Sequence, residues 1–111
     1  MPGAVAYKIL TAEQMRALEE DRFEGAPIDV ADGYIHLSTA DQVAGTLDAH
    51  FAGQHDLFLA AVDLTAAGDA VRWERSRGCA LFPHLYGRLE RALVLASGPV
   101  RRTESGVELP G

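Results

Sequence analysis

The chain of 111 residues has almost none of the features that mark disulfide-linked, cysteine-zinc or membrane-spanning proteins. Its one cysteine, Cys79, excludes an intrachain disulfide and a cysteine-rich zinc site. The longest apolar runs, such as residues 57–62, are too short to span a bilayer. Residues 1–10 carry one lysine and no signal-peptide pattern, so we expect a cytoplasmic protein. With 48% hydrophobic and 23% charged residues, residues 1–111 are expected to form a single domain.

Motifs that would name a reaction are missing as well. The chain has no Walker loop, G-x-G-x-x-G, H-E-x-x-H or G-x-S-x-G pattern. His50 and His55 could bind a metal together with Glu74 or His84. Their spacing matches no established ligand register, however, so we expect no metal site.

The 16 acidic residues outnumber the ten basic ones, and nine of these ten are arginine. The net charge of −6 disfavours nucleic acid and anionic membranes as partners. Residues 1–71 hold twelve acidic against three basic residues, a charge of −9, whereas residues 72–111 hold four against seven, a charge of +3. Arginine-favouring codons and ion pairs with the acidic half would explain this contrast. Alternatively, the C-terminal half holds a small anionic ligand, which arginine is suited to bind.

Hydrophobic periodicity and turn residues predict an α+β protein with two early helices followed mostly by strands. Helices are predicted at residues 12–21, after a capping box of Thr11 and Gln14, and at 40–52, capped by Ser38 or Thr39. Residues 23–33, 66–69 and 76–87 are predicted as loops or turns. Strands are predicted at residues 4–10, 34–37, 57–64, 71–75 and 89–96, with a terminal hairpin over 100–103 and 106–109.

The first motif that could carry chemistry is Asp-Gly-Tyr-Ile-His-Leu-Ser-Thr, residues 32–39. His36 points to the opposite sheet face from its two apolar neighbours. Ser38 and Thr39 precede the free N–H groups of the next helix, where an anion is favoured. The motif therefore predicts a ribose or phosphate site. On the alternative interpretation, Ser38 and Thr39 only cap the helix and His36 is a hydrogen-bonded strand residue.

The second motif is Val-Arg-Trp-Glu-Arg, residues 71–75. In a strand, Arg72 and Glu74 share one face while Trp73 points to the other. Glu74 could then act as a base or accept a ribose hydroxyl, with its charged form favoured by the neighbouring arginine. A surface ion pair worth ~0–1 kcal/mol is the simpler alternative.

The third motif is Phe-Pro-His-Leu-Tyr-Gly, residues 82–87. Aromatic rings, a rigid proline and the polar tips of His84 and Tyr86 fall within six residues that we expect to be a loop. Loops of this composition often line ligand pockets. The alternative is a lid over the core, with the Tyr86 hydroxyl bonded to backbone.

Together, the three motifs resemble domain-of-unknown-function family 952, a set of small, mostly bacterial proteins, over about residues 7–95. That family is similar to a compact ADP-ribosyltransferase-like fold, which binds NAD between two small sheets. The resemblance implies that His36 contacts a ribose, that Tyr86 holds the nicotinamide and that Glu74 is the acid. Here Glu74 precedes Tyr86, which departs from the usual histidine, tyrosine, acid order, whereas Glu90 would restore it.

We therefore expect small mixed or antiparallel sheets, two early helices and an ADP-ribosyltransferase-like cleft. The first hypothesis is an enzyme that acts on NAD or another nucleotide-like anion, with Arg72 or Arg75 neutralising phosphate. The second is a non-catalytic module that binds a small anionic metabolite or a protein partner. His36, Glu74 and Tyr86 are the expected catalytic residues, and the cleft is completed by Ser38, Thr39, Arg72 and His84.

Overall fold

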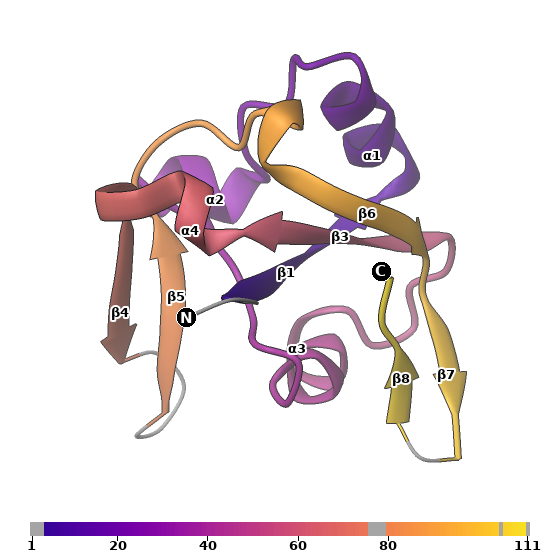
Figure 1. Ribbon diagram of the computed structural model, residues 1–111. Helices are drawn as coiled ribbons and strands as arrows, with labels where there is room; N and C mark the ends of the chain where they lie inside the picture. The colour runs from indigo at the N-terminus through magenta and orange to yellow at the C-terminus, as the bar shows by residue number, and fades with distance from the viewer. Residues whose placement is uncertain (1–3, 76–79, 105, 111) are drawn as a thin grey trace.

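Two three-stranded antiparallel sheets form the centre of the computed structural model, which describes residues 4–75, 80–104 and 106–110. In the first sheet, β3 (Leu57–Asp63) lies between β1 (Val5–Thr11) and β6 (Val94–Pro99). In the second, β5 lies between two outer strands, and Figure 1 shows it beside β4. The strands of this second sheet are β2 (Ile35–His36), β5 (Leu81–Leu85) and β4 (Val71–Arg75).

Short helices and a terminal hairpin surround the two sheets (Figure 1). The hairpin, β7 (Arg101–Thr103) with β8 (Gly106–Glu108), confirms the predicted C-terminal pair. Among the described residues, no helix is long and apolar enough to cross a membrane. The α+β class is thus confirmed, with antiparallel sheets. The helices are α1 (Ala12–Glu19), α2 (Pro27–Asp32), α3 (Val43–His50) and α4 (Leu64–Ala67), with 3-10 turns at Gly68–Ala70 and Arg91–Leu93.

The apolar run of β3 is the central strand of its sheet, as predicted, and most of its residues are buried. One core cluster lies around Leu10, Leu37 and Leu85, and thus joins side chains of both sheets. A second cluster packs α3 against β1 and β3. The sheets are also joined through backbone, since Tyr7 and Ser38 exchange two N–H···O bonds of 2.7 and 2.9 Å.

The segment over residues 23–33 is not the plain loop that we predicted, because it contains helix α2. Pro27 supplies the φ of the first turn, and the Asp29 carboxylate accepts the backbone N–H of Ala26 at 2.8 Å. Gly33 ends the helix in the left-handed conformation, with φ of 86°. Pro27 therefore begins this short helix and Gly33 caps its end, although proline and glycine within residues 23–33 are typical of a loop.

The described part of residues 76–87 also differs from prediction, because strand β5 occupies its centre. Pro83 lies in the middle of this strand and supplies no N–H. Its carbonyl still accepts the N–H of Leu37 at 3.1 Å, so the strand keeps a partner on that side. The proline made the segment look irregular, and the four consecutive buried residues from Phe82 to Leu85 give no polar–apolar alternation that would indicate a strand. Residues 76–79 lie outside the described part.

Three other predicted boundaries are wrong. The helix expected over residues 40–52 begins at Val43 and ends at His50, since residues 40–42 form a turn. The strand expected over 89–96 begins only at Val94, after a 3-10 turn, and the turn expected over 66–69 contains the end of α4. By contrast, Thr11 and Gln14 form the predicted capping box, and α1 begins directly after it.

Candidate functional site

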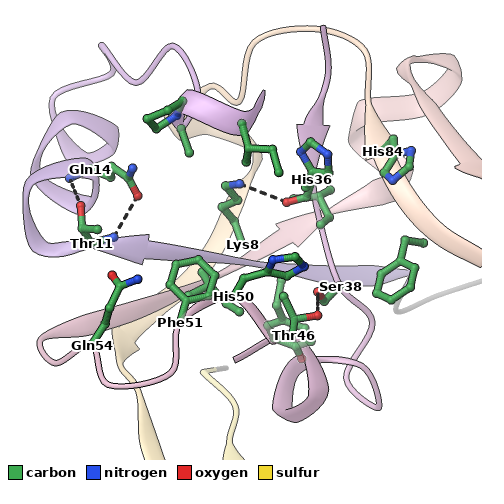
Figure 2. A pocket seen from close by; sticks show the side chains of 17 residues that line it. Lys8, Thr11, Gln14, His36, Ser38, Thr46, His50, Phe51, Gln54 and His84 are labelled. Atoms are coloured by element: carbon green, nitrogen blue, oxygen red, sulfur yellow. Dashed lines mark hydrogen bonds between the residues drawn. The ribbon is translucent and has the colours of Figure 1, made fainter. Parts of the chain in front are cut away.

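A cavity of about 510 Å³ opens between β1, the β2 and β5 strands, and the helical segments around them. Figure 2 shows Thr11, Gln14 and Gln54 at one end, with His36 and His84 toward the other. Tyr7, Phe51 and Phe82 add aromatic rings to its wall. A concave, largely apolar wall with a few polar groups is typical of a small-molecule site.

The second sheet presents a polar face beside this cavity, because alternate residues of a strand point the same way. His84 of β5 lies opposite His36 on one side and Arg72 on the other, and Glu74 lies opposite Phe82. Arg72 and Glu74 therefore share one face, as predicted, and this face also carries both histidines. Trp73 faces the other side and is half exposed.

One carboxylate oxygen of Glu74 accepts two hydrogen bonds. His84 Nδ1 and the Tyr86 hydroxyl each lie 2.8 Å from Glu74 Oε1. The hydrogen bond from His84, and then the one from Tyr86, lower the pKa of Glu74 below its usual value. The same carboxylate raises the pKa of Tyr86 through its hydrogen bond. Glu74 is therefore ionised at neutral pH and orients the His84 ring.

His84 is the buried histidine of the site, with 2% of its surface exposed. Its Nδ1 carries the hydrogen that Glu74 accepts. Its Nε2 is buried and has no hydrogen-bond partner among the described residues. A buried polar atom without a partner costs free energy, so this nitrogen lowers the stability of the fold.

Tyr34 links the aromatic residues of this face. Its ring stacks on that of His84 with a centroid distance of 4.2 Å, and it lies 4.7 Å from the His36 ring and 5.1 Å from the Tyr86 ring. Burial, and then the charge of Asp32 and of Glu74, raise the pKa of the Tyr34 hydroxyl. We did not single out Tyr34 from the sequence, although it stands two residues before His36 and so on the same face.

A buried ion pair between Lys8 and Asp29 contacts His36. Lys8 Nζ lies 2.8 Å from Asp29 Oδ2 and 3.2 Å from the backbone oxygen of His36. His36 Nδ1 lies 2.7 Å from Asp29 Oδ1, and its Nε2 lies 3.0 Å from Asp32 Oδ2. Burial alone would raise the pKa of Asp29, but the hydrogen bond from His36 and the charge of Lys8 outweigh it and lower that pKa to about 2. Burial lowers the pKa of Lys8, and Asp29 offsets part of this.

Ser38 and Thr39 do not cap the following helix, contrary to prediction. The helix begins at Val43 after Gln42, and no side chain caps it. Ser38 Oγ lies 3.0 Å from Thr46 Oγ1, and Gln42 reaches back to accept the N–H of Thr39 at 3.0 Å. The turn over residues 40–42 therefore separates Ser38 and Thr39 from the start of the helix at Val43, and the predicted capping is wrong.

The expected single cleft is divided in the structure. His36, Ser38 and His84 line the cavity, whereas Thr39 and Tyr86 are not among its described lining residues. Arg72 and Glu74 are likewise on the open part of the sheet face, where the Arg72 guanidinium lies 4.9 Å from the Tyr86 ring centroid. His84 connects the two parts, since it lines the cavity and bonds to Glu74.

Sequence reasoning missed most of the cavity, including Lys8, Gln14 and Phe51. Lys8 had a signal, because a lone lysine within the apolar run of β1 requires a buried partner. The sequence around Gln14 and Phe51 carries no signal for a cavity. It indicates only that Gln14 caps a helix and that Phe51 lies on the apolar face of one. They reach the cavity only through the folding of distant segments.

The hypothetical metal site does not form around His50 and His55. His50 lines the cavity and His55 does not. Within the described ranges, no group of three histidine, cysteine, aspartate or glutamate side chains could hold a metal ion. Cys79 and Arg77 lie outside these ranges.

Comparison with protein-family models finds a match over residues 9–97 to "Protein of unknown function (DUF952)". This chain belongs to the DUF952 family. The resemblance that the three motifs suggested is thus confirmed at the level of the family. A comparison with curated proteins finds no match.

Solved structures of one bacterial protein match closely. The crystal structure of protein CC0527 from Caulobacter crescentus is 39% identical, with a TM-score of 0.84, over 97% of this chain and 94% of that one. Its solution NMR structure is 40% identical, with a TM-score of 0.77, over 93% and 90% of the two chains. Neither name gives an activity or a ligand.

Proposed function

We propose that this protein binds a nucleotide-like small molecule, NAD or another ADP-ribosyl compound, in the cavity beside the second sheet. The observation that carries the proposal is the cavity with the Glu74–His84 pair at its edge, which orients a buried histidine that lines it. A volume of about 510 Å³ lies within the range of ~300–1,000 Å³ that ligand pockets span. The ADP-ribosyltransferase-like resemblance of the three motifs names the ligand class.

In this proposal, each motif supplies one part of the site. His36, held by Asp29 and Asp32, orients a ribose at the cavity wall. Tyr86 stacks on or hydrogen-bonds the base, and Arg72 neutralises a phosphate on the open part of the face. Glu74, with its pKa lowered, stabilises an oxocarbenium-like centre or activates the acceptor.

Incubation with NAD, followed by detection of released nicotinamide, tests this enzymatic form. We expect Glu74→Gln to abolish turnover while binding of NAD, measured by calorimetry, stays nearly intact. Glu108→Gln, at an exposed position of β8, is the matched control and should leave both unchanged. Equal loss of turnover and binding in Glu74→Gln would contradict the role given to this carboxylate.

A non-catalytic binding module is the second candidate. One observation favours it: Glu74 Oε1 is already shared by His84 and Tyr86, so this oxygen is engaged within the protein. On this alternative, NAD or ADP-ribose binds saturably and no nicotinamide is released.

A further inference from the structure

We propose that a second copy of this chain binds along the outer edge of β4, the edge that faces away from β5. In this pairing β4 of one copy runs antiparallel to β4 of the other, and a two-fold axis passes between their Trp73 residues. The second sheets of two molecules then form one continuous sheet. The inference goes beyond the proposed function and does not depend on it, because it concerns the edge of the sheet and not the cavity.

The backbone of β4 has an open edge. β4 is an outer strand of its sheet, and Figure 1 shows it at the margin of the molecule. The Pro83 oxygen accepts the N–H of Leu37, so the hydrogen-bonding side of Pro83 faces β2 and its pair with Trp73 is a non-bonded one. The N–H and C=O groups of Trp73 and Arg75 therefore point away from β5. None of these four groups has a hydrogen bond recorded with a described residue.

The other outer strands of the two sheets are short, covered or interrupted. β2 has two residues, and the edge of β1 is met by Ser38, which pairs with Tyr7. β6 ends at Pro99, and its register with β3 contains an irregularity. Short strands, prolines and bulges are the devices by which sheets prevent pairing at their edges. By contrast, β4 has five residues in an unbroken register and no proline, so its edge can accept another strand.

The charges of β4 select one register for a second copy. Charged side chains on an edge usually oppose pairing, but here they alternate in sign around the central tryptophan. When Trp73 lies opposite Trp73 of the second copy, Arg72 of each copy lies opposite Glu74 of the other. A shift of two residues, the smallest step that keeps the open edges facing each other, places either two Arg72 or two Glu74 side chains opposite each other. Like charges in that position destabilise a sheet, so the register at Trp73 is favoured.

Both members of this ion pair are available in the single chain. Glu74 Oε1 accepts hydrogen bonds from His84 and Tyr86, whereas Oε2 has no partner recorded among the described residues, and 39% of the side chain is exposed. Arg72 is exposed and lies over the Tyr86 ring, without an ion pair recorded within the described ranges. In a non-bonded pair the Cα atoms are about 4.5 Å apart, so the two side chains are close enough to contact. Arginine has five N–H donors, so this contact leaves donors for a phosphate.

The other face of β4 carries exposed apolar side chains. Trp73 lies opposite Pro83, and Leu81 lies opposite Arg75, so all four residues share this face. Trp73 is 49% exposed and Leu81 is 50% exposed. In the proposed pairing the two Trp73 rings lie opposite each other, and aromatic pairs in this position stabilise a sheet. Association therefore covers aromatic surface that the single chain leaves in water.

The test measures the oligomeric state of the whole chain and the protection of the β4 edge. Sedimentation equilibrium at micromolar to millimolar concentration should show a shift from one chain toward two as the concentration rises. Hydrogen exchange, followed by NMR in a dilute and a concentrated sample, locates the interface. The amides of Trp73 and Arg75 should exchange more slowly in the concentrated sample, whereas those of Arg72 and Glu74, which already face β5, should change less.

A substitution tests the register. Arg72→Glu places carboxylates opposite Glu74 at both ends of the pairing, so we expect it to weaken association about tenfold. Arg101→Glu, at an exposed position of β7, is the matched control, because it changes the net charge equally and should leave association unchanged.

A chain that stays single at millimolar concentration would overturn the inference and leave the edge of β4 to a strand of another protein. Association without slower exchange at Trp73 and Arg75 would also overturn it, since another surface would then join the copies. Equal weakening by Arg72→Glu and Arg101→Glu would show that net charge, and not the β4 register, controls association. The exchange measurement on the wild type decides the matter even if Arg72→Glu fails to fold.

Discussion

At the scale of single residues, Asp29 supports the histidine side of the site. Its carboxylate accepts hydrogen bonds from Lys8, from the backbone N–H groups of Ala26 and His36, and from the His36 ring. We expect Asp29→Ala to lower the free energy of unfolding by about 3–5 kcal/mol, since it leaves the buried Lys8 ammonium without its partner. Urea denaturation measures this loss. Asp32→Ala, at an exposed carboxylate, should cost less than about 1 kcal/mol, and similar losses in both would contradict this account.

Asp29 also predicts a dependence of stability on pH. Its folded pKa of about 2 lies below the usual 3.8, so its contribution is complete above about pH 4 and is lost as the pH falls toward 2. The difference in unfolding free energy between the wild type and Asp29→Asn should therefore shrink between pH 5 and pH 2. Denaturation curves across this range measure it, and a constant difference would argue against the pairing.

Tyr86 tests the hydrogen bonding of Glu74. Tyr86→Phe removes one of the two donors on Glu74 Oε1, so the pKa of Glu74 should rise toward its usual value. A ¹³C NMR titration of the Glu74 carboxyl measures this change. Tyr34→Phe is the matched control, because the Tyr34 hydroxyl has no recorded hydrogen bond to Glu74. An unchanged titration in Tyr86→Phe would mean that the hydroxyl does not donate to Glu74 in solution.

At the scale of elements, the sequence predicts best where periodicity is long and uninterrupted. The apolar run of β3, the capping box of α1 and the terminal hairpin are found as predicted. Helix α2 and strand β5 were missed because both contain a proline, which reads locally as a loop residue. In α2 the proline occupies the first turn, and in β5 its carbonyl still bonds to Leu37. Both outcomes depend on tertiary partners that no local pattern contains.

The end of α2 supplies a prediction on a single glycine. Gly33 has φ of 86°, and a Cβ added there would meet no heavy atom within 4 Å. Gly33→Ala should therefore cost about 1 kcal/mol of stability from backbone strain alone. Gly87→Ala is the matched control, since that position is equally open and has no positive φ, and it should be nearly neutral. Thermal unfolding compares the two, and equal stability would show that the left-handed conformation at Gly33 is not strained by a side chain.

The site itself was only partly predictable at this scale. Alternation along the predicted strand placed Arg72 and Glu74 on one face, and the register of β4 confirms this. It did not place His84 or Tyr86, because residues 76–87 were expected to be a loop, and the hydrogen bonds of both residues with Glu74 are seen only in the structure. The cavity wall contributed by β1 and the helices was not found. This wall forms only when Tyr7 of β1 pairs with Ser38, which follows β2. No residue spacing in the sequence predicts that pairing.

At the scale of the whole molecule, the Tyr7–Ser38 backbone pair joins the two sheets beside the cavity. We expect the two sheets to unfold as one unit. The amide hydrogens of Tyr7 and Ser38 should then exchange with solvent at rates within about tenfold of the rate of Leu59 in the central strand. Hydrogen exchange followed by NMR measures the three rates. Much faster exchange at Ser38 would show that the second sheet opens independently.

The central claim is that the cavity beside the second sheet is the binding site for a nucleotide-like molecule. The most direct measurement is a titration of the ¹⁵N-labelled protein with NAD, in which the backbone amides and the histidine rings are followed together. The account predicts saturable shifts at cavity-lining residues such as Lys8, His36, Ser38 and His84, with β7 and β8 unaffected. The absence of any shift at millimolar NAD and ADP-ribose, or saturable shifts confined to residues outside the cavity wall, would contradict it.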